Sequence, residues 1–88
     1  MYRYELDCMF NRQKSFYRKA YVVVDNNIKT LYSYDTPVLE YNCITNEFTR
    51  LWYDWSSTTG KHIQEFCKQV SGLWDYNYNK AWLDSLDE

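Results

Sequence analysis

The chain has 88 residues, a length that supports one small domain, which we take as residues 1–88, with a single core. Apolar residues make up 45% and charged residues 25%, and these near-average values exclude a disordered or fibrous chain. The formal net charge of −2 argues against duplex-DNA binding, because domains that bind phosphate backbones usually carry a basic excess. Aromatic residues reach 20%, so a few large rings can build much of the core.

The sequence also bears on the cellular compartment. No run approaches the roughly 18–20 apolar residues that a membrane helix needs, and residues 1–5 lack a signal-peptide pattern. The cysteines Cys8, Cys43 and Cys67 are odd in number and not closely paired, which argues against a disulfide framework. We therefore expect a cytoplasmic protein without membrane contact.

The N-terminal part of the chain predicts strands. Alternating apolar and polar residues indicate a half-buried strand near residues 2–8, followed by a polar turn at 11–14. The aromatic and β-branched run 16–24 is the clearest strand. Asn26 tolerates the positive φ of a tight hairpin, which leads to a return strand over 28–34.

Two further strands are expected after Pro37, which breaks the preceding strand because it has no N–H to donate. They cover residues 38–44 and 47–53, joined by a tight turn at 45–46. Together these segments predict an antiparallel meander of four or five strands.

The third part of the chain predicts helices. An apolar stripe with helical spacing runs through Ile63, Phe66, Cys67 and Val70. Residues 56–58 offer N-cap hydroxyls, and Gly72 suits the left-handed C-cap. A short second helix is expected over 79–86, docked on the sheet or on the first helix. The predicted fold class is therefore α+β, with one long helix packed on one face of the sheet and a short C-terminal helix.

His62 is the one histidine, and it stands one helical turn from both Thr58 and Glu65. Such a row could be drawn as a nucleophile, a base and an orienting group. Three neighbours on one helix face would point outward together, however, without a cavity or oxyanion donors around a substrate. We therefore interpret His62 as a boundary residue with its ring over the sheet, and we expect no catalytic residues and no enzyme.

No cofactor or metal is expected either. Cys43, Cys67 and His62 lack the close spacing of structural zinc ligands, and both cysteines are expected to be small buried hydrophobic residues. Two glycines cannot form a glycine-rich phosphate loop.

The surplus of aromatic residues indicates a surface function. A small core cannot hide 18 rings, and exposed clusters of Trp and Tyr are typical of protein-binding surfaces. Residues 73–88 also carry four acidic and one basic side chain, which would suit a basic partner. The alternative is that these rings pack the second helix down. The predicted partner-binding residues are Tyr53, Trp55, Asp75, Tyr76, Tyr78 and Asp84.

A second interpretation is nucleic-acid binding. The segment Phe16-Tyr17-Arg18-Lys19 places rings beside Arg18 and Lys19, an arrangement that binds single strands by stacking and charge. Residues 31–88 add no basic excess, so a nucleic-acid partner is the weaker expectation.

Two segments together resemble a known group of proteins. They are Ser33-Tyr34-Asp35-Thr36-Pro37-Val38 and the spaced set Arg50-Leu51-Trp52, Trp55-Ser56, Thr58-Thr59, His62-Ile63 and Glu65-Phe66. The pair resembles a family of small, mostly uncharacterised proteins from phages and mobile elements of Gram-positive and gut bacteria. In that family the second segment looks like a strand-to-helix joint, so the resemblance implies structural roles for these residues.

The resemblance also implies a function. It suggests a phage-type accessory protein in the host cytoplasm that binds and inhibits a host defence protein. The implied activity is that of an anti-CRISPR protein acting on a Cas effector.

Overall fold

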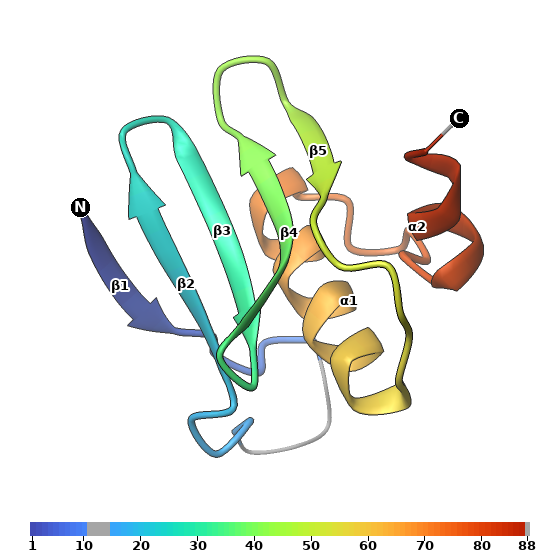
Figure 1. Cartoon of the computed structure of the whole chain (residues 1–88), viewed down its shortest axis with the longest axis horizontal. Helices are drawn as coiled ribbons and strands as arrows, with labels where there is room; N and C mark the ends of the chain where they lie inside the picture. The colour runs from blue at the N-terminus through green and yellow to red at the C-terminus, as the bar shows by residue number, and fades with distance from the viewer. Residues whose placement is uncertain (11–14, 88) are drawn as a thin grey trace.

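The computed structural model describes residues 1–10 and 15–87, and the turn predicted at 11–14 lies outside these residues. It contains a five-stranded antiparallel sheet in the order β1-β2-β3-β4-β5. The longer helix, α1, crosses one face of the sheet, and the shorter α2 lies beside β5 (Figure 1). This confirms the predicted α+β class. The elements are β1 (Tyr2–Glu5), β2 (Ala20–Asp25), β3 (Ile28–Ser33), β4 (Thr36–Asn42), β5 (Glu47–Arg50), α1 (Ser57–Ser71) and α2 (Lys80–Ser85).

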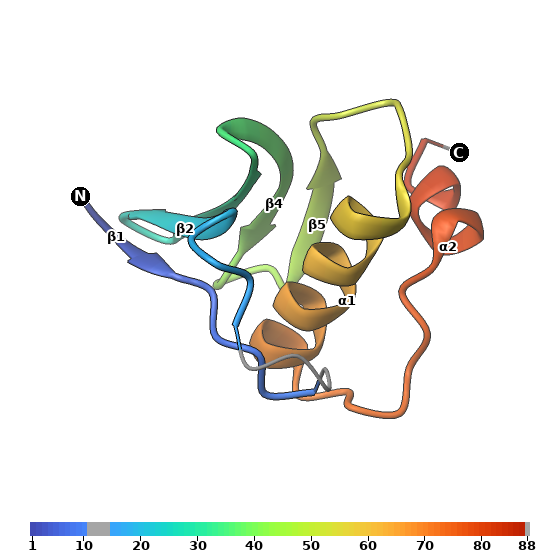
Figure 2. The same ribbon diagram turned by 90° about the horizontal axis from the view of Figure 1, so that it is seen from below.

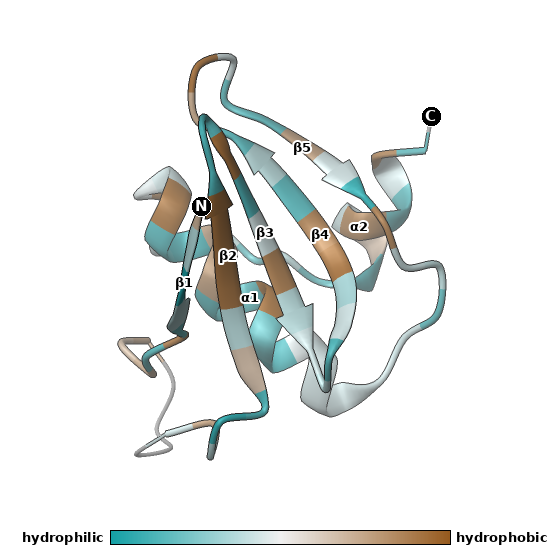
Figure 3. Ribbon diagram, turned by 60° about the vertical axis from the view of Figure 1, so that its left-hand side comes forward, coloured by the Kyte–Doolittle hydropathy of each residue, from teal (hydrophilic) through white to brown (hydrophobic). Residues whose placement is uncertain are grey.

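The core lies between the sheet and α1. Val22 on β2 pairs with Leu31 on β3, which pairs with Leu39 on β4, and all three are buried. Figure 3 shows apolar segments of β2, β3 and β4 beside one another in the sheet, with α1 behind them. The stripe on α1 meets them with Ile63 and Phe66, whose burial contributes about 2–3 kcal/mol each. The alternation in the strands and the helical spacing therefore identify the two halves of one core.

Positive backbone φ angles occur where the hairpins turn. Asn26 and Asn46 have φ of 54° and 60°, so the chain turns at both predicted positions, but the second turn spans residues 43–46 instead of 45–46 because β4 ends at Asn42. Between β3 and β4, Tyr34 and Asp35 are both left-handed, the combination that a two-residue hairpin requires. Pro37 lies inside β4 rather than before it. The register between β3 and β4 shifts beside Pro37, between Leu31 and Tyr32, and such irregular positions are where strands accept a proline without an N–H.

Four predicted strands are shorter in the structure. β1 ends at Glu5 instead of residue 8, and β3 ends at Ser33 instead of residue 34. Tyr17 and Arg18 have positive φ, and the Lys19 N–H donates to the Phe16 carbonyl at 2.9 Å, so residues 16–19 form a turn before β2. Phe16 is buried in this turn, against the predicted strand over 16–24. The last predicted strand ends at Arg50 instead of residue 53, and the chain then crosses to α1.

The helix ends are as predicted. The Thr59 N–H donates to the Ser56 hydroxyl at 3.1 Å, and Gly72 adopts φ 74° at the C-cap, where its N–H donates to Lys68 O at 3.0 Å. At α2, the Trp82 N–H donates to the Asn79 side chain at 2.9 Å. In the described residues, no helix has the length and apolar character to cross a membrane.

Candidate functional site

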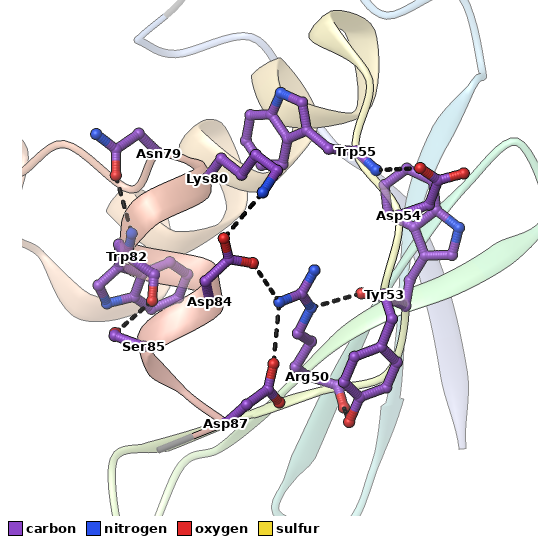
Figure 4. A network of polar contacts seen from close by, with 11 residues as sticks. Arg50, Tyr53, Asp54, Trp55, Asn79, Lys80, Trp82, Asp84, Ser85 and Asp87 are labelled. Atoms are coloured by element: carbon purple, nitrogen blue, oxygen red, sulfur yellow. Dashed lines mark hydrogen bonds and ion pairs between the residues drawn. The ribbon is translucent and has the colours of Figure 1, made fainter.

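The predicted partner-binding residues fall into two groups at opposite ends of α1. Tyr53 and Trp55 precede its N-terminus, and Asp84 on α2 lies with them in one polar network (Figure 4). Residues 75–78 follow its C-terminus. The two groups have different environments, which decide what each can do.

The N-terminal group is organised by Arg50, whose side chain is only 5% exposed. Its Nη1 donates to Asp84 Oδ1 at 2.7 Å and to Asp87 Oδ2 at 3.0 Å, and its Nε donates to the Trp52 carbonyl at 2.8 Å. Hydrogen bonds from Lys80 and then from Arg50 lower the pKa of Asp84. We call Arg50, Asp84 and Asp87 the α2 latch, because they hold α2 against the end of β5 (Figure 4).

The rings beside the latch are also engaged within the molecule. The Arg50 guanidinium lies 4.9 Å from the centroid of the Tyr53 ring. Trp55 packs over Gly60, where an added Cβ would come within 2.6 Å of the indole. Tyr53, Trp55 and Asp84 thus all contribute to the joint between β5, α1 and α2.

The C-terminal end of α1 carries exposed apolar side chains. Trp74 is 63% exposed and Leu73 is 58% exposed, so neither side chain packs back on the last turn of the helix. We call the exposed cluster at this end the aromatic patch; its members are Phe10, Leu73, Trp74 and Tyr76. Contiguous exposed apolar side chains of this kind mark interaction surfaces.

The aromatic patch is hollowed in two places. One hollow of about 430 Å³ is lined by residues 72–76, with Asp75 supplying the one charge. A second hollow of about 420 Å³ lies between the β4–β5 hairpin and α2, and Leu73 and Tyr76 line both. The second is lined mostly by aromatic rings, namely Tyr41, Phe48, Tyr76, Tyr78 and Trp82.

Polar contacts of Glu65 and Gln69 on α1 position the patch. The Phe10 N–H donates to Glu65 Oε1 at 2.8 Å, and Gln69 Nε2 bridges Glu65 Oε2 and the Asp7 carbonyl at 2.7 and 2.8 Å. These bonds hold the segment after β1 along α1 and bring the Phe10 ring to 5.7 Å from Trp74. Two segments far apart in the sequence therefore build one surface.

Tyr78 was predicted to contact a partner, but the structure places it in the core. It is 3% exposed, and its hydroxyl lies 2.7 Å from the Ser71 hydroxyl. Burial raises the pKa of Tyr78. Its ring packs edge-on against Trp82 and supports Tyr76 at 4.7 Å. The neighbouring Tyr76 remains half-exposed, so the predicted packing of this segment holds for Tyr78 alone.

His62 does not lie at the boundary as predicted. It is 1% exposed, with Nδ1 2.8 Å from the Ser33 hydroxyl, which also lies 3.0 Å from the Thr59 hydroxyl. Its ring meets Phe16 edge-on at 4.6 Å. Burial, aided by the nearby charges of Lys19 and Lys61, lowers the pKa of His62 to about 4.

Glu65 was expected to point outward with His62, and it too is buried. Its carboxyl group is accommodated inside because the Phe10 N–H and Gln69 Nε2 donate to its two oxygens. Thr58, His62 and Glu65 therefore do not form a group on the surface, since only Thr58 is exposed.

The cysteines lie in three different environments and are free thiols. Cys67 is buried as predicted, and burial raises its pKa well above the usual range. Cys43 is exposed, against the prediction, because β4 ends at Asn42 and Cys43 begins the turn. In residues 1–10 and 15–87, no three His, Cys, Asp or Glu side chains are grouped so that they could hold a metal ion.

The fold defines a small α+β protein whose open surface feature is an aromatic patch at one end of its helix. The chain belongs to a family of unknown function, DUF8033, whose model matches residues 4–85. Comparison with curated proteins and with solved structures gave no match.

Proposed function

We propose that the protein is a non-enzymatic binding protein that docks a partner protein on its aromatic patch. The observation that carries this proposal is the exposure of Leu73, Trp74 and Tyr76 beside two hollows, whereas at the other end of α1 Trp55 is partly buried against Gly60 and the exposed Tyr53 ring lies on the buried Arg50 guanidinium. Trp and Tyr are the residues that most often supply binding energy at protein interfaces.

The chemistry of the patch favours a partner with basic and apolar groups. Asp75 lies among its rings, and Asp7 is exposed near it on the segment that Gln69 holds. The C-terminus of α1 adds the negative end of its helix dipole at the same place, offset in part by Lys68 in the last turn. Negative charge would steer a basic surface to the patch, and the rings would supply most of the affinity.

The proposed partner is a component of host defence, and the proposed activity is that of an anti-CRISPR protein on a Cas effector. This part of the proposal is supported by the resemblance carried by residues 33–38 and 50–66. A Cas effector presents a basic nucleic-acid channel. That charge is the complement of the patch.

A phage-challenge assay tests this function. Bacteria with an active CRISPR system that targets a phage would express the chain, and plaque formation would be compared across CRISPR types. We expect bacteria with one CRISPR type to lose protection against the phage when they express the wild-type chain, and to keep that protection when they express Trp74→Ala. Tyr53→Ala is the matched control, since Tyr53 is similarly exposed but belongs to the other end of α1. Protection that persists in every type would refute the defence role.

Nucleic-acid binding remains the second proposed function. Arg18 is exposed and lines a hollow of about 280 Å³ with Arg3 and Tyr21 on the sheet side opposite α1. Lys19 lies 5.8 Å from the Tyr34 ring. A fluorescent single-stranded oligonucleotide should then bind with a steep salt dependence that weakens in Arg18→Ala. Absence of binding at low salt would eliminate this function.

A further inference from the structure

The two edges of the sheet differ in what lies beside them. The outer edge of β5 faces α2, whereas within residues 1–10 and 15–87 no strand or helix lies against the outer edge of β1 (Figure 1). An open edge strand presents main-chain N–H and C=O groups that can pair with another strand.

The hydrogen-bond pattern shows which groups of β1 are directed outward. The Leu6 N–H donates to the Ala20 carbonyl at 3.0 Å. In an antiparallel ladder, hydrogen-bonded pairs alternate with non-bonded ones, so Tyr4 bonds to β2 as Leu6 does. The N–H and C=O groups of Arg3 and Glu5 therefore point away from the sheet.

We infer that β1 pairs antiparallel with β1 of a second copy of this chain, about a twofold axis through Tyr4. This register places Arg3 of each copy opposite Glu5 of the other, so that both outward-facing residues exchange main-chain hydrogen bonds. It also forms two pairs of opposite charge. Centring the axis on Arg3 or on Glu5 would put like charges opposite each other, which is unfavourable.

The tyrosines on the other face of β1 fit the same arrangement. Tyr2 and Tyr4 are 62% and 36% exposed. Figure 2 shows that α1 does not extend beneath β1, the strand that carries them. The axis makes Tyr4 a non-hydrogen-bonded pair with its counterpart, the type of pair in which side chains approach most closely. Pairing would therefore cover rings that the chain alone leaves exposed.

Local contacts hold the charged side chains near the edge. The Arg3 guanidinium lies 4.4 Å from the centroid of the Tyr21 ring, and Glu5 Oε1 accepts the Arg18 N–H at 3.1 Å. A four-residue edge buries less surface than the roughly 1,200 Å² of a stable interface. The dimer is accordingly weak and depends on concentration.

Sedimentation equilibrium of the full chain, over about 10 µM to 1 mM, tests the inference. We expect a monomer–dimer equilibrium that Arg3→Glu weakens about tenfold or more, because two attractive pairs become repulsive. Adding Glu5→Arg to Arg3→Glu should restore the dimer, since opposite charges again face each other across the axis.

A second variant distinguishes loss of the dimer from a folding defect that the charge substitutions could cause. Arg3→Pro removes an outward-facing N–H without touching the bonds to β2, and it should abolish the dimer at an unchanged thermal midpoint. A chain that is monomeric throughout, including one that binds an unrelated extended peptide on β1, would overturn the inference. So would a dimer that ignores both Arg3→Pro and the charge swap.

Discussion

The two ends of α1 use the same kinds of residue for opposite purposes. At the N-terminal end, Tyr53 and Trp55 lie against Arg50 and Gly60, and Asp84 on α2 with Asp87 just after it completes the α2 latch. At the C-terminal end, Trp74 stands exposed beside Asp75 over open hollows. An aromatic and acidic composition therefore does not by itself identify a binding surface. What separates the two ends is whether a buried cation engages the carboxylates and rings.

Phe66→Ala tests the core that both ends share. Phe66 is fully buried in the middle of the apolar stripe of α1, so its removal should lower the free energy of unfolding by about 3–5 kcal/mol. Chemical denaturation would measure the loss. An unchanged unfolding midpoint would mean that α1 does not pack on the sheet through this stripe.

Lowering the pH tests the buried histidine. The folded pKa of His62, about 4, lies below its ordinary value of 6.5, so the unfolded chain takes up a proton more readily. Stability should be complete above pH 6.5 and fall by up to about 3 kcal/mol as the pH drops towards 4.

Urea unfolding at several pH values would show this slope, and His62→Gln should flatten it. The carboxylate of Asp84 cannot produce the same slope, because its lowered pKa confines its effect to more acidic conditions. An equal slope in wild type and His62→Gln would contradict the buried neutral state of the ring.

Arg50→Ala tests the latched end. The substitution removes charge-assisted hydrogen bonds to two carboxylates and one to the Trp52 carbonyl, and it should cost about 2 kcal/mol. Much of this loss should appear as earlier release of α2, visible in amide hydrogen exchange of residues 80–85. If α2 stayed as protected as in the wild type, the latch would not be what holds it.

Trp74→Ala has the smallest expected effect on stability. The side chain is mostly exposed, so the free energy of unfolding should change by less than about 0.5 kcal/mol. Thermal unfolding would measure it beside Arg50→Ala. A loss as large as that of Arg50→Ala would show that the aromatic patch is structural and that the ends of α1 do not differ.

A matching test of charge uses Asp75 rather than Asp84. Both acidic residues were predicted to be surface charges of a binding site, but Asp84 bonds to Arg50 and Lys80. Replacing it would disturb the latch as well as any interface. Asp75→Lys changes the field of the aromatic patch alone, and it should weaken binding to a basic partner and reduce its salt dependence.

Local patterns in the sequence account for most of the fold. The meander, its Asn turns and both caps of α1 follow from residues within a few positions of each other. The segment 16–19 was mistaken for a strand because its β-propensity is high, whereas its conformation is set by packing of Phe16 against His62. A contact between segments so distant in the sequence leaves no local pattern.

The candidate site was less predictable for the same reason. Tyr76 could be named from aromatic clustering, but Phe10 joins it only through Glu65, which is 55 residues away in the sequence. The only sequence signal for Phe10 was an apolar residue beyond the first strand. Tyr78 and Asp84 looked alike from composition. In the structure Tyr78 is buried beside Ser71, and Asp84 stays half-exposed but is bound by Arg50.

The most direct test of the account compares the two ends in one binding experiment. Tagged wild type, Trp74→Ala and Tyr53→Ala would be matched for folded fraction and used to capture the effector whose activity the chain blocks in the phage assay, with the retained amount measured by quantitative mass spectrometry. The account predicts that wild type and Tyr53→Ala retain the effector and that Trp74→Ala loses it. Retention by Trp74→Ala together with loss by Tyr53→Ala would contradict the assignment of binding to the C-terminal end of α1.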